Sequence, residues 1–345
     1  AYTTIDDPSA HFQTKLYTGN STNNTAITND GNSDLQPDLI WAKSRSNTHY
    51  HDWRDTSRGL TKRLASNDNG AESTKDQSYV SFDSDGFTLG DDTDGSGSAL
   101  NTVNTSSNNY VAWQWKANGG TTSTNNDGSV AVTLQTNSTA GFSIGTFTGT
   151  GDSSGTIGHG LGAKPDWLVV KRRDGSENWN NIFANFDSKL LRLNTDGASF
   201  TGSAINSVGA STFTDGNGNN AVFYAFKSIQ GYSKFGSYKG NGNADGRFVY
   251  TGFKPAWVMF KRFDSSNDWL IFDNKRNTSN ITEKVIYADT SQAEQDDSQH
   301  SGSLDLLSNG FKMRETGNSG NGNGATYVYA AFAEHPFVSS KGVPV

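Results

Sequence analysis

The stretch Pro165-Asp-Trp-Leu-Val-Val-Lys171 occurs in three related forms in this chain of 345 residues. The other two copies are Pro37-Asp-Leu-Ile-Trp-Ala-Lys43 and Pro255-Ala-Trp-Val-Met-Phe-Lys261. Each copy ends in a Lys after a short apolar run that lacks helical spacing, which is typical of a buried β-strand. The predicted strands are residues 38–43, 167–171 and 257–261. Recurrence at a long interval predicts three units that share one pattern.

An aromatic-rich closing stretch follows each copy of this motif later in the chain. The closing stretches are Tyr110-Val-Ala-Trp-Gln-Trp-Lys116, Ala221-Val-Phe-Tyr-Ala-Phe-Lys227 and Tyr327-Val-Tyr-Ala-Ala-Phe-Ala333. Aromatic and β-branched residues occupy both alternating faces of these stretches, as in a central strand. All 8 Trp lie in repeated stretches. Because each unit needs the same internal support, we predict that the Trp belong to the core.

A second strand is predicted after each Pro–Lys motif. Trp179 and Trp269 both stand 14 residues after their Pro and open short apolar runs, which indicates a hairpin. We assign Trp53, two residues later, as the counterpart in the first unit. The second unit is shorter than the others, and its version of the Gly-Phe block of the first and third units is assigned to Asp196-Gly-Ala-Ser-Phe200.

The composition narrows the fold class and the kinds of partner. Charged residues make up 18% of the chain, the net charge is −7 and 38 residues are Gly, so turns and strands are favoured over long helices. No basic run indicates a nucleic-acid partner. The absence of Cys excludes disulfides and thiolate metal sites. No apolar run reaches the roughly 20 residues of a membrane-spanning helix, so membrane insertion is not predicted.

These patterns predict an all-β protein made of three tandem β-sandwich units with jelly-roll or lectin-like topology. The first segment is residues 1–118, the shorter second segment is residues 128–230 and the third segment is residues 231–345. Residues 119–127 are rich in Gly, Asn, Ser and Thr and are predicted to be a linker.

The motifs also resemble a known class of proteins. The motifs that carry the resemblance are Gly160-Leu-Gly-Ala-Lys-Pro165-Asp, Val170-Lys-Arg-Arg-Asp174, Ser84-Asp-Gly-Phe-Thr-Leu-Gly90 and Tyr110-Val-Ala-Trp-Gln-Trp-Lys-Ala117. Their ordered combination resembles tandem-repeat virion proteins of marine tailed bacteriophages, which are usually labelled tail-fibre or uncharacterised structural proteins. The resemblance implies a component on the exterior of the phage particle that contacts other virion proteins. It implies no catalytic residue.

Function is expected where the three units differ. The first unit alone carries an aromatic and histidine cluster and an acidic loop, and these are the candidate contacts for a glycan or a protein partner. The candidate residues are His49, Tyr50, His51, Trp53, Asp91, Asp92 and Asp94. The two His with Asp52 could hold zinc or nickel, and the acidic loop could hold calcium. We interpret both as solvated polar segments and predict no metal or cofactor.

Several functions remain open from the sequence. The leading hypothesis is a non-enzymatic, oligomeric tail-fibre or receptor-binding adhesin that contacts host-surface glycans. A capsid decoration or vertex protein is the alternative within the virion, and a secreted cellular adhesin shares the same physics. A capsule-degrading glycanase or lyase is the enzymatic alternative. Gly151-Asp-Ser153-Ser-Gly155 resembles a nucleophile elbow near His159, but a glycine-rich loop stands where the motif needs a helix, so we predict no enzyme.

Overall fold

The computed structural model describes residues 3–93, 103–151, 154–215, 218–296, 302–339 and 341. Within these ranges the chain is built of β-strands, with one 3-10 turn, η1 (Pro8–Ala10), and no α-helix. The predicted all-β class is confirmed. In the same ranges no helix has the length and apolar character that a membrane span requires.

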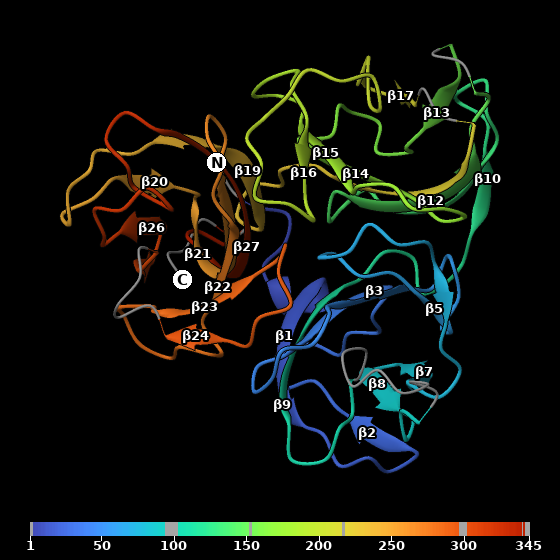
Figure 1. Ribbon diagram of the computed structural model, residues 1–345, viewed down its shortest axis with the longest axis horizontal. Coiled ribbons are helices and arrows are strands. Elements are labelled where there is room, and N and C mark those ends of the chain that lie inside the picture. The colour runs from blue at the N-terminus through green and yellow to red at the C-terminus, as the bar shows by residue number, and fades with distance from the viewer. Residues whose placement is uncertain are drawn as a thin grey trace.

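Three antiparallel main sheets share one strand order, and they surround a common centre (Figure 1). The first runs β1 (Phe12–Thr18), β9 (Asn109–Trp115), β3 (Leu39–Ser44), β4 (Asp52–Asp55). The second contains β12 (Phe142–Thr148), β18 (Asn220–Phe226), β14 (Trp167–Arg172), β15 (Asn180–Phe183), β16 (Leu191–Arg192). The third runs β19 (Ser233–Lys239), β27 (Thr326–Pro336), β21 (Phe253–Arg262), β22 (Trp269–Asp273), β23 (Lys284–Tyr287), β24 (Gln295–Asp296).

The second main sheet has two additional strands on the outer side of β12. They are β10 (Ser123–Asn125) and β11 (Val132–Asn137). The strand β10 lies inside the predicted linker, which is therefore partly sheet. The residues just before β10 are also held, because the backbone N–H groups of Gly119 and Gly120 donate to the Asp38 carboxylate at 2.8 and 2.7 Å. The low apolar content of residues 119–127 concealed both attachments.

The Pro–Lys motifs form strands as predicted, β3, β14 and β21. In each main sheet this strand lies between the closing strand and the hairpin strand. The Lys that ends each motif turns its ammonium group back onto backbone carbonyls: Lys43 Nζ donates to Ser44 O at 2.7 Å and Lys261 Nζ to Arg262 O at 2.6 Å. Burial lowers the pKa of Lys43 to about 7 and those of Lys171 and Lys261 to about 8. The repeated Lys thus has a structural role at the strand end.

A small sheet covers the outer face of each main sheet. The first is β2 (Thr25–Ile27), β8 (Gly86–Leu89) and β7 (Tyr79–Asp83); the second is β13 (Thr156–Gly158) and β17 (Thr212–Thr214); the third is β20 (Phe248–Tyr250), β26 (Gly310–Met313) and β25 (Leu304–Leu307). A further two-stranded sheet joins β5 (Lys62–Arg63) and β6 (Ser73–Thr74). Each segment is therefore a sandwich with its own outer apolar cluster.

The small sheets correct one assignment in the second segment. Ile27 pairs with Phe87 and Val249 pairs with Phe311, and the corresponding pair in the second segment is Ile157 with Phe213. Phe200, which the sequence suggested as the counterpart, forms an isolated bridge with Leu190 instead. The Gly-Phe turn explains why the sequence suggested Phe200 instead of Phe213. Gly86 has φ +97°, and a Cβ there would lie 2.1 Å from Ile27 O, so the first segment needs Gly at this turn. The second segment lacks this hairpin and therefore its sequence signature.

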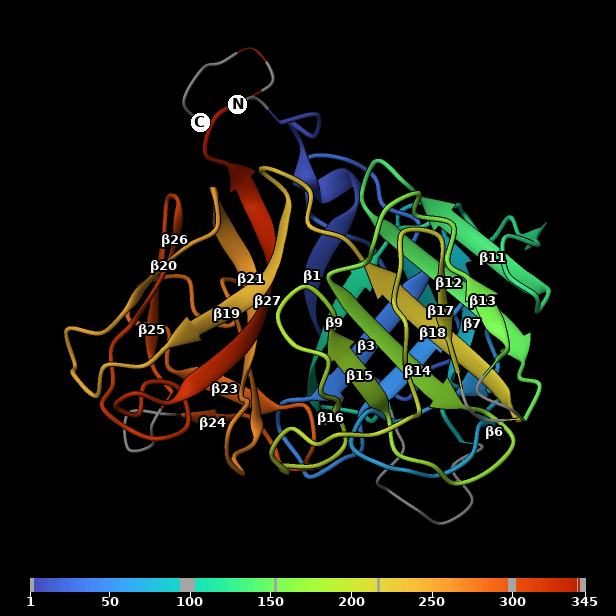
Figure 2. The same ribbon diagram turned by 90° about the horizontal axis from the view of Figure 1, so that it is seen from above.

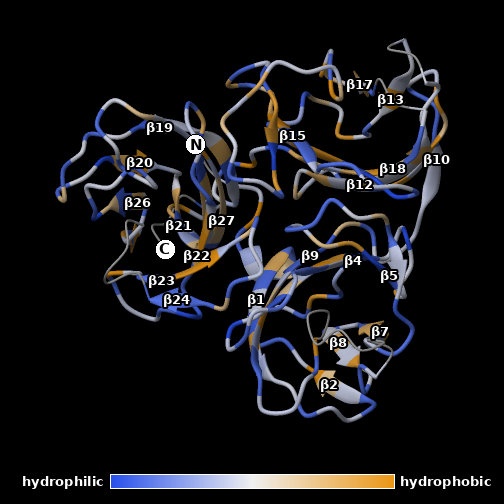
Figure 3. Ribbon diagram, in the orientation of Figure 1, coloured by the Kyte–Doolittle hydropathy of each residue, from blue (hydrophilic) through white to orange (hydrophobic). Residues whose placement is uncertain are grey.

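The largest apolar cluster is shared by all three segments. It contains buried residues from the inner faces of all three main sheets, among them Trp41, Trp167 and Trp257. Viewed from above, the second main sheet lies across the first (Figure 2), and hydrophobic residues are concentrated in the strands while most loops are hydrophilic (Figure 3). Each main sheet is thus covered on both faces. The segments do not behave as three separate cores joined by a linker, because removing one would expose the central cluster of the other two.

All eight Trp are buried, as predicted. The assigned equivalence of Trp53 is wrong, however. Trp53 pairs with Trp41, and in the other two sheets the residues at the position of Trp53 are Asn181 and Ile271. Trp179 and Trp269 each lie two residues before that position. The residue of the first segment that matches Trp179 and Trp269 is His51, also 14 residues after its Pro.

These three matched residues link the segments in a ring. Trp179 Nε1 donates to Ala65 O of the first segment at 2.8 Å, and Trp269 Nε1 donates to Arg192 O of the second at 3.0 Å. His51 Nδ1 accepts from Trp41 Nε1 at 2.7 Å, so its Nε2 carries the proton and donates to Tyr287 O of the third segment at 2.9 Å. Through these three matched residues each segment therefore donates to a neighbouring segment, and the contacts close around the common centre.

Candidate functional site

The predicted histidine and aromatic site of the first segment is inside the protein. His49, His51 and Trp53 are buried, and His51 is fully enclosed by its bonds to Trp41 and Tyr287. Burial lowers the pKa of His51 well below its usual value. An external glycan cannot reach these three side chains, so the site is not retained there. The repeat spacing could have indicated that His51 is buried, because His51 lies as far from its Pro as the core residues Trp179 and Trp269 do from theirs.

Tyr50 is the one partly accessible member of this cluster. Its ring lies 6.0 Å from the Arg63 guanidinium, which covers it. Asp92 is also buried: its carboxylate accepts hydrogen bonds from the backbone N–H groups of Val103 and Asn104 at 2.6 and 3.1 Å. Burial raises the pKa of Asp92 to about 6. Asp92 therefore ties the outer layer of the first segment together.

The acidic loop is only partly within the described residues. Asp91 Oδ1 accepts from the hydroxyl of Thr93 at 3.1 Å, and Asp94 lies outside the described residues. Across the described ranges no group of three His, Cys, Asp or Glu side chains is arranged to hold a metal ion.

Of the two candidate residues of the hydrolase-like motif, Ser153 and His159, only His159 can be placed. Ser153 lies outside the described residues. His159 is buried, and its two ring nitrogens contact Gly209 O and the N–H of Leu161, both at 3.3 Å. Burial lowers the pKa of His159. With both nitrogens occupied by backbone groups, this His supports the chain turn at Leu161.

The described surface contains a cleft that the sequence reasoning missed. It has a volume of about 340 Å³ and is lined by Tyr250 and Phe337 together with polar groups from Gln230 and Lys234. Tyr250 is 61% exposed and Phe337 is 37% exposed. We call this site the aromatic cleft. Its neighbour Phe248, 41% exposed, lies two residues before Tyr250 on β20, so the two rings are on the same face of the strand. Large exposed aromatic rings beside polar groups are the usual composition of a recognition surface.

Among the three small outer sheets, aromatic rings occupy the positions of Phe248 and Tyr250 in the third segment alone. In the first segment the register places Ala26 where Phe248 stands and Thr28 where Tyr250 stands, and both are exposed. In the second segment the corresponding residues are Thr156 and Gly158. The signal was present as Phe248-Val-Tyr250, aromatic residues alternating around a buried Val. It was missed because these edge strands are only three residues long and share just an apolar residue at their matched positions, Ile27, Ile157 and Val249.

Part of this aromatic surface also supports the sheet. A Cβ added to Gly310 would lie 3.0 Å from the ring of Phe248, so that ring packs over a glycine of the neighbouring strand β26. Such a contact compensates for a missing side chain in a sheet. Tyr250 packs less closely than Phe248. A Cβ at Gly252 would lie 3.5 Å from the Tyr250 hydroxyl, an ordinary van der Waals distance, and 61% of Tyr250 is exposed. Tyr250 is therefore the residue most available to a ligand.

A second cleft lies between the first and third segments. Its volume is about 250 Å³, and it shares no lining residue with the aromatic cleft. Hydrogen bonds from Ser9 and Ser33 outweigh burial and lower the pKa of Asp7 in this cleft. Asp30 likewise has a lowered pKa, because bonds from Lys275 and Lys15 outweigh burial. Glu315, whose burial raises its pKa to about 7, lines neither cleft.

The comparisons with known proteins give a family. The model of the family described as "Domain of unknown function (DUF7483)" matches residues 7–336. The chain belongs to this family. In the DUF7483 chain the match spans all three main sheets, from η1 to the end of β27. No curated protein and no solved structure matched the chain.

Proposed function

We propose that this DUF7483 chain is a non-enzymatic protein of the exterior of a phage particle, and that it acts as an adhesin that binds glycans in the aromatic cleft. One observation carries the binding role: Tyr250 and Phe337, both of the third segment, are exposed beside a cleft of about 340 Å³. The virion setting is supported by the resemblance of the repeated motifs to phage structural proteins.

The chemistry of the cleft suits a sugar. An exposed aromatic ring can pack against the apolar face of a pyranose, and small polar groups can bind its hydroxyls. The backbone carbonyl of Gln230 already accepts from the Thr3 hydroxyl at 2.6 Å, which anchors one wall of the cleft. Lys234 adds a cation, so a sugar that carries a carboxylate or sulfate would gain an additional contact.

The rigid architecture suits repeated, weak attachment. Because the three main sheets share one core, the cleft keeps a fixed orientation relative to the rest of the molecule. In a virion that carries several copies, in contact with one another and with other virion proteins, weak sites on rigid supports combine into strong attachment.

A glycan array probed with the purified chain tests this proposal. We expect binding to a subset of host-type glycans, and we expect Tyr250→Ala to reduce it about tenfold, the factor that corresponds to about 1.4 kcal/mol of lost contact with the ring. Val80→Ala is the matched control, because Val80 is also exposed, at 43%, but lies on β7 of the first segment.

Three results would contradict the proposal. Glycan binding that is unchanged in Tyr250→Ala would move the site elsewhere. No binding to any glycan, together with labelling of the capsid rather than the tail by antibodies against the chain, would favour the decoration or vertex role. New reducing ends after incubation with host polysaccharide would restore the glycanase alternative.

A further inference from the structure

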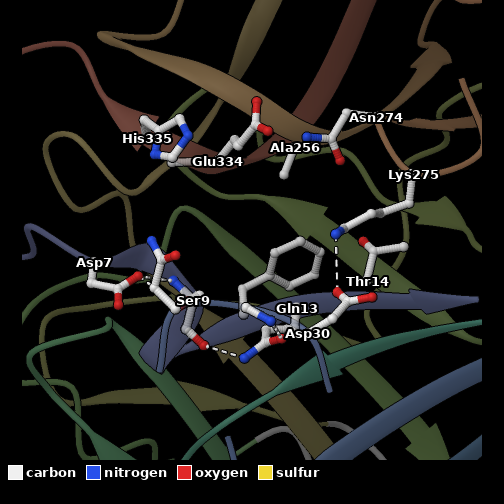
Figure 4. Close-up of a pocket in the computed structure, with 14 residues that line it drawn as sticks. Asp7, Ser9, Gln13, Thr14, Asp30, Ala256, Asn274, Lys275, Glu334 and His335 are labelled. Atoms are coloured by element: carbon white, nitrogen blue, oxygen red, sulfur yellow. Dashed lines mark hydrogen bonds and ion pairs between the residues drawn. The ribbon is translucent and has the colours of Figure 1, made fainter. Parts of the chain in front are cut away.

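The cleft between the first and third segments has the features of a separate ligand site. Figure 4 shows two rows of side chains facing each other, with Gln13, Thr14 and Asp30 in one row and Asn274, Lys275 and His335 in the other. Its volume of about 250 Å³ equals the space of about eight water molecules at about 30 Å³ each. We call it the junction cleft.

The charged groups of the junction cleft already have partners. Asp30 accepts from Lys275 Nζ at 2.9 Å and from Lys15 Nζ at 3.2 Å. Glu334 pairs with Lys254 at 2.7 Å. The Asp7 carboxylate accepts from Ser9 and Ser33. A ligand with a net charge would therefore have to compete with an existing ion pair, whereas a neutral ligand would not.

A neutral hydroxyl in the same cleft has no partner. Thr14 is 5% exposed and lines the cleft, and its Oγ1 makes no hydrogen bond within the described part of the chain. A buried hydroxyl without a partner costs free energy that a suitable ligand can recover. Thr14 follows Phe12 by two residues on β1, so the two side chains are on the same face of the strand. The ring of Phe12 belongs to the central cluster, where it stacks on Phe332 at 5.1 Å.

The remaining lining is mixed in the way that a sugar requires. Phe12, Ala256 and Ala333 contribute apolar surface, and the side-chain amides of Asn32 and Asn274 contribute donors and acceptors. A pyranose presents one apolar face and several hydroxyls that both donate and accept. Amide and hydroxyl groups match this pattern without leaving a buried charge unpaired.

We propose that the junction cleft binds a neutral, hydroxyl-rich ring of the size of one sugar residue, with Thr14 and Asn274 as hydrogen-bonding groups. This site goes beyond the proposed adhesive function, because it shares no lining residue with the aromatic cleft. Its occupant bridges the first and third segments. Binding therefore stabilises their junction as well as holding the ligand.

Ligand-observed NMR of the full chain with D-galactose, D-mannose and N-acetyl-D-glucosamine tests the site. We expect saturable binding of at least one of these sugars. Thr14→Val should weaken it by about 2- to 10-fold, the factor that corresponds to one hydrogen bond. Thr14→Val replaces an unpaired hydroxyl by a methyl group of the same shape, so the variant should fold with an unchanged or higher Tm.

Two controls separate this site from the aromatic cleft. Thr18→Val changes a Thr on the same strand whose hydroxyl instead contacts Asn109 Oδ1 at 2.9 Å, and it should bind the sugar as the wild type does. Tyr250→Ala should also retain the binding, even where it abolishes attachment to glycans on an array. The proposal is overturned if none of the three sugars binds saturably, or if Thr14→Val binds as tightly as Thr18→Val.

Discussion

Two junctions between segments make the same backbone contact with opposite side-chain chemistry. Where the first and second segments meet, the N–H of Glu72 donates to Arg173 O at 2.8 Å. Where the second and third meet, the N–H of Ser199 donates to Phe263 O at 2.9 Å. The junction of the third with the first repeats this bond from Glu294 to Arg45 O at 3.0 Å. Backbone geometry is therefore common to all three junctions.

The first of these junctions is ionic. Glu72 receives two hydrogen bonds from Arg173, at 2.9 and 3.0 Å, and one from Arg58 at 3.1 Å. Arg58 also pairs with Asp55 at 2.5 Å, and both of these side chains are fully buried. Tyr224 of the second segment donates to the same Asp55 at 2.6 Å. Charges removed from water in this way must be completely paired to be tolerated.

The junction of the second and third segments is apolar. Phe183 stands where Asp55 stands in the first segment, and it stacks on Trp269 with ring centroids 6.4 Å apart. Phe186 packs edge-on against Phe263 at 5.0 Å. Neither Phe needs a partner charge. The comparison shows that the backbone contact fixes how neighbouring segments are arranged. The side chains around this contact can be either a complete ionic set or a complete apolar set.

The largest expected effect comes from breaking the ionic set. Arg58→Ala leaves Asp55 buried without its cation, and we expect the free energy of unfolding to fall by about 3–5 kcal/mol. Chemical denaturation measures this. Arg276→Ala at the junction of the third and first segments is the matched variant, because Arg276 pairs with Asp273 at 2.5 Å in the same way. A loss below about 1 kcal/mol in both would show that the buried pairs do not hold the junctions.

A smaller effect is expected at the apolar junction. Phe186 is 37% exposed, so Phe186→Ala removes only part of a buried ring and one edge-on aromatic contact. We expect a loss of about 1–2 kcal/mol, measured by the same denaturation experiment. The loss should not change with salt concentration, since no charge takes part. A loss that equals that of Arg58→Ala would remove the distinction between the two junctions.

The smallest effect concerns a pair of acids that faces the apolar junction. In the second segment Asn194 accepts from the N–H of Trp179 at 2.9 Å and donates to Asn178 at 2.9 Å. In the third segment Asp289 accepts from the N–H of Trp269 at 3.0 Å and lies beside Asp268. Burial and the Asp268 carboxylate raise the pKa of Asp289 well above its usual value, with Lys261 and Asp196 as the other charged neighbours of Asp268.

A raised carboxyl pKa in the folded state means that folding favours the protonated form. The pair therefore stabilises the fold at low pH, and this contribution is lost as pH rises through the folded pKa. We expect Asp289→Asn to gain roughly 1 kcal/mol at pH 8, seen as a rise in Tm of about 2–4 °C that disappears toward pH 4. The reverse variant Asn194→Asp should lose stability at pH 8. Equal Tm gains at both pH values would contradict the raised pKa of Asp289.

The strands could be predicted from the sequence because they depend on local patterns. The motifs that end in Lys43, Lys171 and Lys261 carry uninterrupted apolar runs, and only a strand covered on both faces accommodates these. The shared core could not be predicted, because contacts between segments have no period in the sequence. Burial of the Trp was predictable, but that Trp179 reaches the first segment was not.

The candidate site was predicted poorly for a related reason. His49, His51 and Trp53 looked specific to one segment by residue type, yet the backbone position of His51 is common to all three. The informative difference was at Tyr250, on a strand of three residues. Its counterparts, Thr28 and Gly158, can be identified only after the sheet registers are known, because strands this short have no recognisable pattern of their own.

The ring of hydrogen bonds from His51, Trp179 and Trp269 has a consequence for assembly. Each segment joins the next head to tail, and such contacts generate either a closed ring or an open filament. Here the rotation closes after three segments within one chain, so every head already meets a tail. In the part of the chain that the structure describes, the three matched residues thus all bond within the chain and offer no head-to-tail contact to another copy. Any contact between copies of this protein would use the outer sheets and edges.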